Sequence, residues 1–440
     1  MSKRDGLARL GKIKTSHGIL DTPTLLPVVN PKILTLSMED LKKCGAQGII
    51  TNSYIIYKNP ELKEIAENKG VHGLLNWSGP IMTDSGTFQS HVYGEIDMQP
   101  EEILNFQKKI GVDIGTVLDV FCEPETRFED AKKELEETQK RIEESDKNKD
   151  SIFLAAPIQG GRHLDLRLKA AQMASKTNAD LFPIGGVVPL MEKNNFKMLA
   201  EVIIASKKGL DTSKPVHLFG CGHPMLFALA TFLGCDLFDS SSYAKFASRD
   251  SLMFTWGTRN LEELEIIPSE FSAAPGININ ELKAMEKKER QKIIAKHNLI
   301  ASFAEIRRVK QAIHDGLLWE LVENRLRTSP ALMKVFEVIK KEMDWIGKFE
   351  PAYRYKTPLK TGEESDFRPV FSNLSNSFKS GEMTHPYFGK VPIHLSETYP
   401  FHPGLLQDDI EGWQMQNWDV ERVKTILDYQ FGKGMGDVLT

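Results

Sequence analysis

A regular alternation of short apolar runs and amphipathic segments fills the first 240 residues of the chain. Each apolar run has the length of one buried strand and stops at a polar residue or a glycine. The alternation repeats about every 30 residues, which is typical of βα units that build a parallel sheet. The apolar runs end, in chain order, at Val29, Ile50, Met82, Leu118, Ile158, Ile184, Phe219 and Phe238.

Helical spacing of apolar residues follows most of these runs. The clearest examples are residues 101–110, 130–145, 163–176, 196–207 and 224–232. Eight βα units favour an α/β fold closed into a (β/α)8 TIM barrel. The first strand has the weakest signal, so an open parallel sheet stays the alternative.

The chain changes character after Asp239. Helical patterns cover residues 279–286, 292–314 and 318–342, and residues 356–381 are rich in Ser, Thr, Asn and Gly, which is typical of a long loop. A short strand at 391–395 and a helix at 420–430 follow. We therefore expect a TIM-barrel catalytic domain at 1–347 and a small C-terminal α+β domain at 348–440.

Charge and composition exclude several classes of protein. The 56 basic and 60 acidic residues give a net charge of −4, so the chain is not uniformly coated in positive charge. No apolar stretch approaches the roughly 20 residues of a membrane span, and the first residues do not resemble a secretory leader. The four cysteines are scattered, as expected of a cytoplasmic protein with reduced thiols and no membrane partner.

One basic stretch, 287–292, is followed by Arg307, Arg308 and Lys310. It predicts either a face that contacts phosphates or a solvated helix surface. Both interpretations stay open at this point.

Carboxylates follow three of the predicted strands. Asp84, Asp119 and Asp239 come where apolar runs end, and the carboxyl ends of barrel strands meet at one mouth. Two carboxylates at one site are the usual means of cleaving a glycosidic bond. An Asp at a strand end also caps the following turn, and Asp84-Ser85-Gly86 fits that simpler role.

Other residues are predicted to join this mouth. Gln159 follows one strand, and Gly185-Gly186 follows the next. Glycines let backbone amides approach a flat ligand, and Phe88 offers a ring that could stack on a planar base. Together these residues predict a pocket for a planar, polar-edged molecule.

Five peptides resemble the tRNA-guanine transglycosylases, above all their archaeal branch. The resemblance extends over residues 7–350 and more weakly to the C-terminus. It rests on 51–54, 83–89, 183–190, 217–225 and 235–243.

This resemblance implies exchange of guanine for a 7-deazaguanine in tRNA without a break in the backbone. In the archaeal branch the guanine is at position 15 of the D-loop and the incoming base is 7-cyano-7-deazaguanine, in archaeosine biosynthesis. The implied roles are Asp239 as nucleophile, Asp84 as general acid and base, Asp119, Gln159 and the Gly185-Gly186 backbone as contacts to the base edge, and Phe88 as a stacking ring. Two alternatives stay open, a relative that modifies DNA and a catalytically silent RNA-binding subunit.

The chain departs from the family at its structural zinc site. Where a Cys-x-Cys-x-x-Cys run is expected, the sequence has Ser269, Phe271 and Ala274, and only His297 remains of the ligands. A single imidazole without thiolates does not hold zinc, so we expect no metal and no cofactor. His297 is expected to be a helix residue hydrogen-bonded in the core, with Phe271 packed into the vacated space.

Length is the second departure. Archaeal relatives continue into a C-terminal RNA-binding PUA domain, whereas this sequence stops at Thr440. We expect a separate chain to supply that domain. A homodimer formed through the altered zinc region stays open.

Overall fold

The computed structural model describes residues 3–87, 99–268, 273–274, 276–350, 364–365, 368, 382–385 and 389–392. The chain divides into one compact unit, Met1–Ile339 with Tyr353–Lys356, and a second, Lys340–Ala352 with Thr357–Thr440. The boundary expected between residues 347 and 348 stays a prediction.

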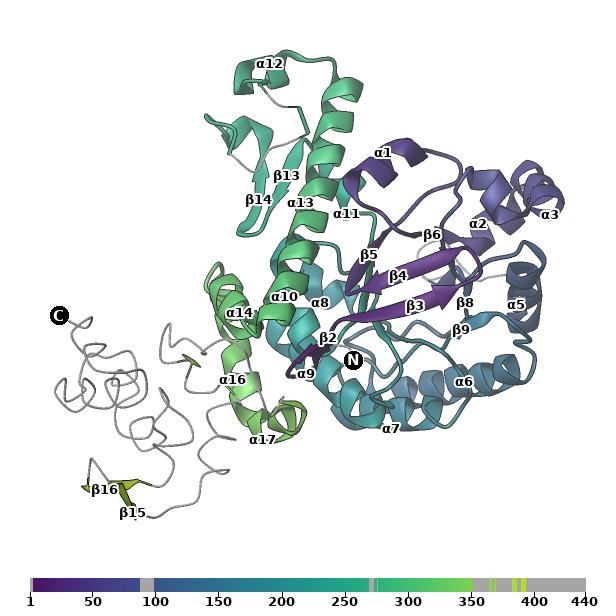
Figure 1. Cartoon of the computed structure of the whole chain (residues 1–440). Coiled ribbons are helices and arrows are strands. Elements are labelled where there is room, and N and C mark those ends of the chain that lie inside the picture. The colour runs from purple at the N-terminus through teal and green to yellow at the C-terminus, as the bar shows by residue number, and fades with distance from the viewer. Residues whose placement is uncertain are drawn as a thin grey trace. The chain divides into compact units, whose positions relative to one another are not determined.

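The first unit is a closed barrel of eight parallel strands (Figure 1). Two four-stranded sheets, ordered β6-β7-β8-β9 and β10-β11-β12-β5, are joined by parallel bridges between Val28 and Ile50 and between Ala155 and Leu181. The ring therefore closes, which confirms the TIM barrel and excludes the open sheet. The strands are β5 (Thr24–Pro27), β6 (Ile49–Asn52), β7 (Ile81–Asp84), β8 (Ile114–Thr116), β9 (Phe153–Ala155), β10 (Phe182–Ile184), β11 (Val216–Leu218) and β12 (Leu237–Ser240).

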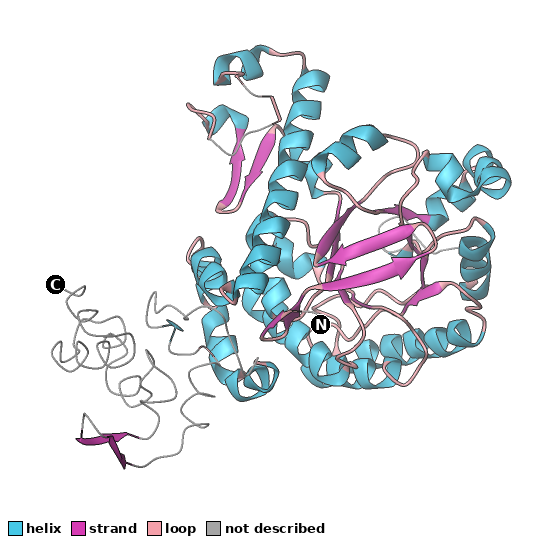
Figure 2. Ribbon diagram, in the orientation of Figure 1, coloured by secondary structure: helices cyan, strands magenta, loops and turns pink. Residues whose placement is uncertain are grey.

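Helices surround the barrel, as expected from the amphipathic segments (Figure 2). Most turn an apolar face toward the strands and a polar face outward; in α6, for example, Ala131, Leu135 and Ile142 are buried, whereas α10 has no charged residue and is almost wholly buried. These helices are α1 (Met38–Cys44), α2 (Ser53–Lys58), α3 (Pro60–Leu75), α5 (Pro100–Lys109), α6 (Phe128–Lys147), α7 (Leu164–Ala174), α8 (Val188–Glu192), α9 (Phe196–Gly209), α10 (Pro224–Phe232) and α11 (Ser242–Ala247).

An N-terminal hairpin closes one end of the barrel. It is made of β3 (Gly11–Thr15) and β4 (Gly18–Thr22), preceded by the short pair β1 (Arg4–Asp5) and β2 (Ala8–Arg9). Ile13 and Leu20 pack into the apolar core of the barrel strands. The Asp21 N–H donates to Gln47 Oε1 (2.9 Å), two residues before β6, so the hairpin covers the amino ends of the strands. The carboxyl ends are the opposite end, where βα loops form sites.

A hairpin and a series of helices complete the first unit. They are β13 (Ser251–Phe254), β14 (Gly257–Asn260), η1 (Leu261–Glu263), α12 (Ile279–Ala284), α13 (Lys287–Asp315), α14 (Leu318–Leu326), α15 (Pro330–Met333) and α16 (Val335–Lys341). The last two residues of α16 already belong to the second unit. The single helix expected at 318–342 is broken, because Pro330 cannot continue a helix and the Ser329 side chain caps a new one.

The second unit contains α17 (Met343–Ile346), η2 (Gly347–Phe349), β15 (Glu382–His385) and β16 (Gly389–Pro392). β16 overlaps the predicted strand at 391–395, whereas the predicted helix at 420–430 lies outside the described residues. None of the helices that the structure describes is long and apolar enough to cross a membrane.

Candidate active site

Three carboxylates occupy the carboxyl end of the barrel. Asp84 is the last residue of β7, Asp239 lies in β12, and Asp119 follows β8 by three residues. Burial and the negative charges of Asp119 and Asp239, opposed by a hydrogen bond from Gly86, together raise the pKa of Asp84 to about 6. The three side chains that the sequence predicts to meet are thus close enough to act on one another.

Asp84 is fixed by hydrogen bonds to both carboxyl oxygens. Gly86 N–H donates to Oδ1 (2.8 Å), which is the local turn that a capping role predicts. Asn52 Nδ2 donates to Oδ2 (3.2 Å) from the neighbouring strand, where Asn52 pairs with Asp84 in register. The side chain therefore both shapes its own turn and faces a shared site.

Asp239 is held through one oxygen. Its Oδ1 accepts from Gly220 N–H (2.9 Å) and lies 2.9 Å from Nε2 of the fully buried His217 on β11. Its Oδ2 makes no hydrogen bond to any described residue, and the side chain keeps 12% exposure. One carboxyl oxygen is anchored and the other is available to a ligand.

Asp119, Gln159 and the glycine pair form one wall of the site. Gln159 Nε2 donates to Asp119 Oδ2 (2.5 Å), and both side chains are buried. A Cβ on Gly185 would lie 2.5 Å from Gln159 Nε2, and one on Gly186 would lie 3.0 Å from Gln159 Oε1. Only glycine fits at these two positions. The buried Gln159 Oε1 has no partner within the described chain.

The expected use of both glycine amides needs a correction. Gly185 N–H donates to Ile158 O (3.1 Å) because the strand pairing continues to that point. The Gly186 N–H makes no backbone hydrogen bond to any described residue, so of the two amides it is the one that a ligand can use. Gly186 has φ +68°, a conformation that favours glycine.

Arg167 on α7 is a supporting residue that the sequence analysis missed. It is fully buried, and its guanidinium donates to Gly161 O (2.8 Å), Ile158 O (2.7 Å) and Gly185 O (2.9 Å). It therefore ties together the two loops that carry Gln159 and the glycine pair. An arginine on the otherwise apolar face of α7 was the signal that could have revealed it.

His217 and Asn52 were missed in the same way. His217 interrupts the apolar run of β11, and Asn52 ends β6, so both could have been noted as polar groups in buried strands. Phe88, the predicted stacking ring, lies outside the described residues, and its role stays a prediction.

The residues of the family's zinc site do not fit a zinc ion. Ser269 and Phe271 lie outside the described residues, and neither they nor Ala274 supply a thiolate. His297 is buried on α13 with Nε2 3.1 Å from Met253 O, as expected of a helix residue bonded in the core. That no metal or cofactor binds here stays a prediction.

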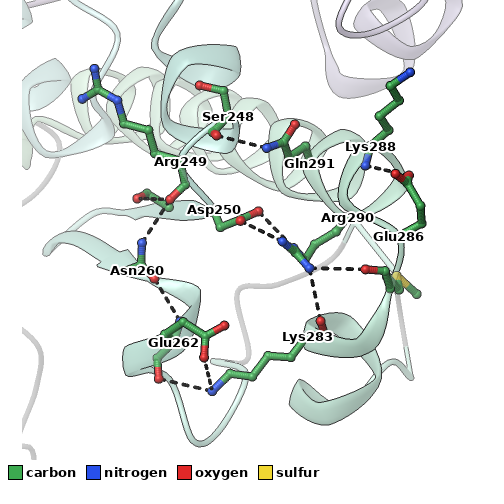
Figure 3. A network of polar contacts seen from close by, with 12 residues as sticks. Ser248, Arg249, Asp250, Asn260, Glu262, Lys283, Glu286, Lys288, Arg290 and Gln291 are labelled. Carbon is green, nitrogen blue, oxygen red and sulfur yellow. Dashed lines mark hydrogen bonds and ion pairs between the residues drawn. The ribbon is translucent and has the colours of Figure 1, made fainter.

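Side chains of α13 form hydrogen bonds to the β13–β14 hairpin, which precedes the segment that corresponds to the family's zinc site. Asn298 Oδ1 accepts from Met253 N–H (2.8 Å), and Nδ2 donates to Ser251 O (3.1 Å). Arg290 forms a two-pronged ion pair with Asp250 (Nη2–Oδ2 2.8 Å; Figure 3). The hairpin is thus tied to α13 by hydrogen bonds.

The basic stretch is therefore not a uniform phosphate-contacting face. Arg290 also donates to Lys283 O (3.2 Å), and Lys310 Nζ donates to Asp21 O (2.6 Å), so these cations have partners inside the chain. Lys287 and Lys288 are exposed at the start of α13. They and Arg307, which is also exposed, are cations of the stretch that a phosphate could reach.

Comparison with known proteins identifies the family to which the chain belongs. The profile of the queuine tRNA-ribosyltransferase family matches residues 4–331. The tRNA-guanine(15) transglycosylase of Methanocaldococcus jannaschii is 44% identical over 417 residues, covering 93% of this chain and 64% of the relative. The protein of that name from Pyrococcus furiosus is 41% identical over 442 residues, covering 99% and 75%. The chain thus spans less than two thirds of the M. jannaschii protein.

Proposed function

Because the chain belongs to the queuine tRNA-ribosyltransferase family, we propose that it is a tRNA-guanine transglycosylase, a pentosyltransferase that replaces guanine in tRNA by 7-cyano-7-deazaguanine. The name of its archaeal relatives, tRNA-guanine(15) transglycosylase, supports position 15 as the target. Archaeosine stays the modification that the resemblance implies. A tRNA substrate supports the expectation of a cytoplasmic location. A separate RNA-binding chain and a second copy of this chain stay predicted partners.

The observation that carries the proposal is the contrast between two carboxyl groups at one mouth. Asp239 has one oxygen anchored by Gly220 and the other available, as a nucleophile needs. The pKa of Asp84 is raised to about 6, within reach of both protonation states near neutral pH. Different environments for two carboxyl groups commonly assign them different roles.

In the proposed first step, Asp239 Oδ2 bonds to C1′ of the nucleotide and the bond between C1′ and N9 of guanine breaks. The bond's electrons go to N9, and the Asp84 carboxyl donates its proton to the departing base. In the second step, ionised Asp84 takes the N9 proton of the incoming base, whose N9 displaces Asp239 from C1′. Two inversions retain the configuration, and no proton is gained or lost overall.

Recognition of the base is assigned to the wall formed by Asp119, Gln159 and Gly185-Gly186. Asp119 is a carboxylate acceptor for the N–H groups of a guanine edge, and the Gly186 amide is a donor for its carbonyl oxygen. Gln159 holds Asp119 in place and adds an unpaired buried acceptor. The target nucleotide must leave its stack to reach this wall.

A catalytically silent binding subunit is the main alternative. It gains no support from the site, because burying three neighbouring carboxyl groups without chemical use is costly. The alternative of a DNA substrate has no support in the names of the relatives, which refer to tRNA.

Exchange of radiolabelled guanine into unmodified tRNA tests the proposal. We expect the wild type to incorporate guanine, to be blocked by 7-cyano-7-deazaguanine, and to form an RNA–protein adduct that survives a denaturing gel. Asp239→Asn keeps the Oδ1 acceptor for Gly220 and should abolish both adduct and exchange. An undiminished adduct in Asp239→Asn would rule out the assigned nucleophile, and binding without exchange by folded wild type would favour the silent subunit.

A further inference from the structure

Two histidines and an aspartate converge at the closed end of the barrel. His17 lies in the turn between β3 and β4, His72 lies in the last turn of α3, and Asp113 directly precedes β8. His17 Nδ1 lies 3.0 Å from Asp113 Oδ1, and His72 Nε2 lies 3.1 Å from Asp113 Oδ2. The two imidazole rings stack with centroids 3.6 Å apart and planes tilted by 24°.

These donor atoms have the spacing of ligands around one metal ion. One ligand atom from each residue lies within 4.8 Å of the others. Zinc binds imidazole nitrogen and carboxylate oxygen at about 2.0–2.2 Å, so two ligands at ordinary angles lie about 3.0–3.5 Å apart. The two nitrogen–oxygen separations fall at the lower end of that range.

Backbone amides already orient the carboxylate. His17 N–H donates to Asp113 Oδ1 (3.1 Å), and Ile81 N–H donates to Oδ2 (2.9 Å). Such supporting hydrogen bonds are usual for ligating carboxylates. The Asp113 side chain is fully buried, whereas His17 is 42% exposed, so solvent reaches the cluster from the side of His17.

We propose that His17, His72 and Asp113 bind a divalent transition-metal ion of the Zn²⁺ type, with water completing the coordination. The ion would displace the protons shared between the imidazoles and the carboxylate. It would also link the hairpin of β3 and β4 to α3 and to the start of β8. Its role is structural, because Asp113 directly precedes β8 and Asp119 follows it by three residues, at most about 20 Å away along an extended chain. The site is therefore separate from the proposed base exchange.

Titration with Co²⁺ tests this site in tag-free protein that has been dialysed against a chelator. We expect one equivalent to produce visible d–d absorption, Zn²⁺ to displace it, and Zn²⁺ at 100 times its Kd to raise Tm by about 5 °C. His17→Gln and His72→Gln should each weaken binding at least tenfold. His17 is in an exposed turn, so its variant keeps the buried packing.

His314→Gln is the matched control, because His314 pairs with Asp315 on the exposed surface of α13 (3.1 Å). It should bind Co²⁺ as the wild type does. Absent binding in folded wild type, or binding that both His17→Gln and His72→Gln leave intact, overturns the proposal and leaves a hydrogen-bonded cluster. Guanine exchange, measured separately, is not expected to need the ion.

Discussion

At the scale of single residues, Asp239 depends on two neighbours that hold Oδ1 and leave Oδ2 available. Gly220 contributes a backbone amide that no side-chain substitution removes, whereas His217 contributes an imidazole 2.9 Å away. His217 is fully buried and reaches only the anchored oxygen, so it is a positioning residue.

Replacing His217 therefore tests positioning without touching the nucleophile. His217→Phe removes the imidazole 2.9 Å from Oδ1 and should lower the single-turnover rate of adduct formation about 10-fold, because a polar contact to a charged group is lost. His217→Gln keeps a donor and should recover most of that loss, with an unchanged KM for guanine. Equal loss in both variants, in step with lowered Tm, would indicate a purely structural role.

The raised pKa of Asp84 predicts how the stability of the fold changes with pH. Its pKa is raised to about 6 by burial and by Asp119 and Asp239, so the folded chain binds a proton that the unfolded chain releases near pH 4. Ionisation of Asp84 therefore lowers stability as pH rises from 4 to 6, and the cost persists above pH 6. Asp84→Asn should be more stable than wild type by about 1 kcal/mol at pH 7.5, with a smaller gain at pH 5, and inactive in exchange.

Asp40 provides a control of opposite sign. Its pKa is lowered to about 2, because hydrogen bonds from Lys296 and Ser37 outweigh its burial. Its stabilising contribution is complete above pH 4 and is lost as pH falls toward 2. Urea unfolding of Asp40→Asn should thus show a loss that is the same at pH 5 and 7.5. An Asp84→Asn difference equally independent of pH would contradict the raised pKa.

At the scale of elements, the loops after β9 and β10 act as one unit. Arg167 bonds to both, and Gly185 and Gly186 leave room for Gln159. The active-site wall is thus set by contacts between consecutive βα units rather than by either loop alone.

Gly186→Ala tests that contact against Gly111→Ala. Both glycines have similar positive φ, +68° and +71°, but a Cβ on Gly186 would collide with Cys122 O whereas one on Gly111 meets nothing within 4 Å. Gly111→Ala should cost about 1 kcal/mol from backbone strain, and Gly186→Ala about 3 kcal/mol with weakened guanine binding. Equal losses in urea unfolding would show that strain alone sets the cost.

At the scale of the whole molecule, the placement of positive charge predicts where the proposed RNA substrate binds. Arg290 and Lys310 are bonded inside the chain, whereas Lys287, Lys288 and Arg307 are exposed to solvent, where a phosphate can reach them. The net charge of −4 fits contact through a local patch.

Substitutions at Lys288 and Arg290 should distinguish a cation that contacts the phosphates of RNA from one that stabilises the fold. Lys288→Ala should leave Tm unchanged and reduce the slope of log K against log salt for tRNA binding by about 1. Arg290→Gln should lower stability by about 1–3 kcal/mol through loss of the Asp250 pair, with little further effect on the slope. A stable Arg290→Gln with a reduced slope would place Arg290 on the RNA instead.

The sequence by itself determined the succession of βα units and the ends of their strands, whereas the closing of the strands into a ring was decided by the structure. Alternation of apolar runs and amphipathic segments is a local pattern, and it placed Asp84, Asp119 and Asp239 at strand ends before any contact was known. Local patterns also missed one break, at Ser329-Pro330, where the periodicity continues across a proline.

Only the tertiary structure decided which side chains meet. Asn52 contacts Asp84 because β6 pairs with β7 in one register, and His217 reaches Asp239 because β11 adjoins β12. His17, His72 and Asp113 come together because a hairpin folds across the amino end of the barrel. Such contacts depend on strand order and register, which periodicity along one chain does not contain.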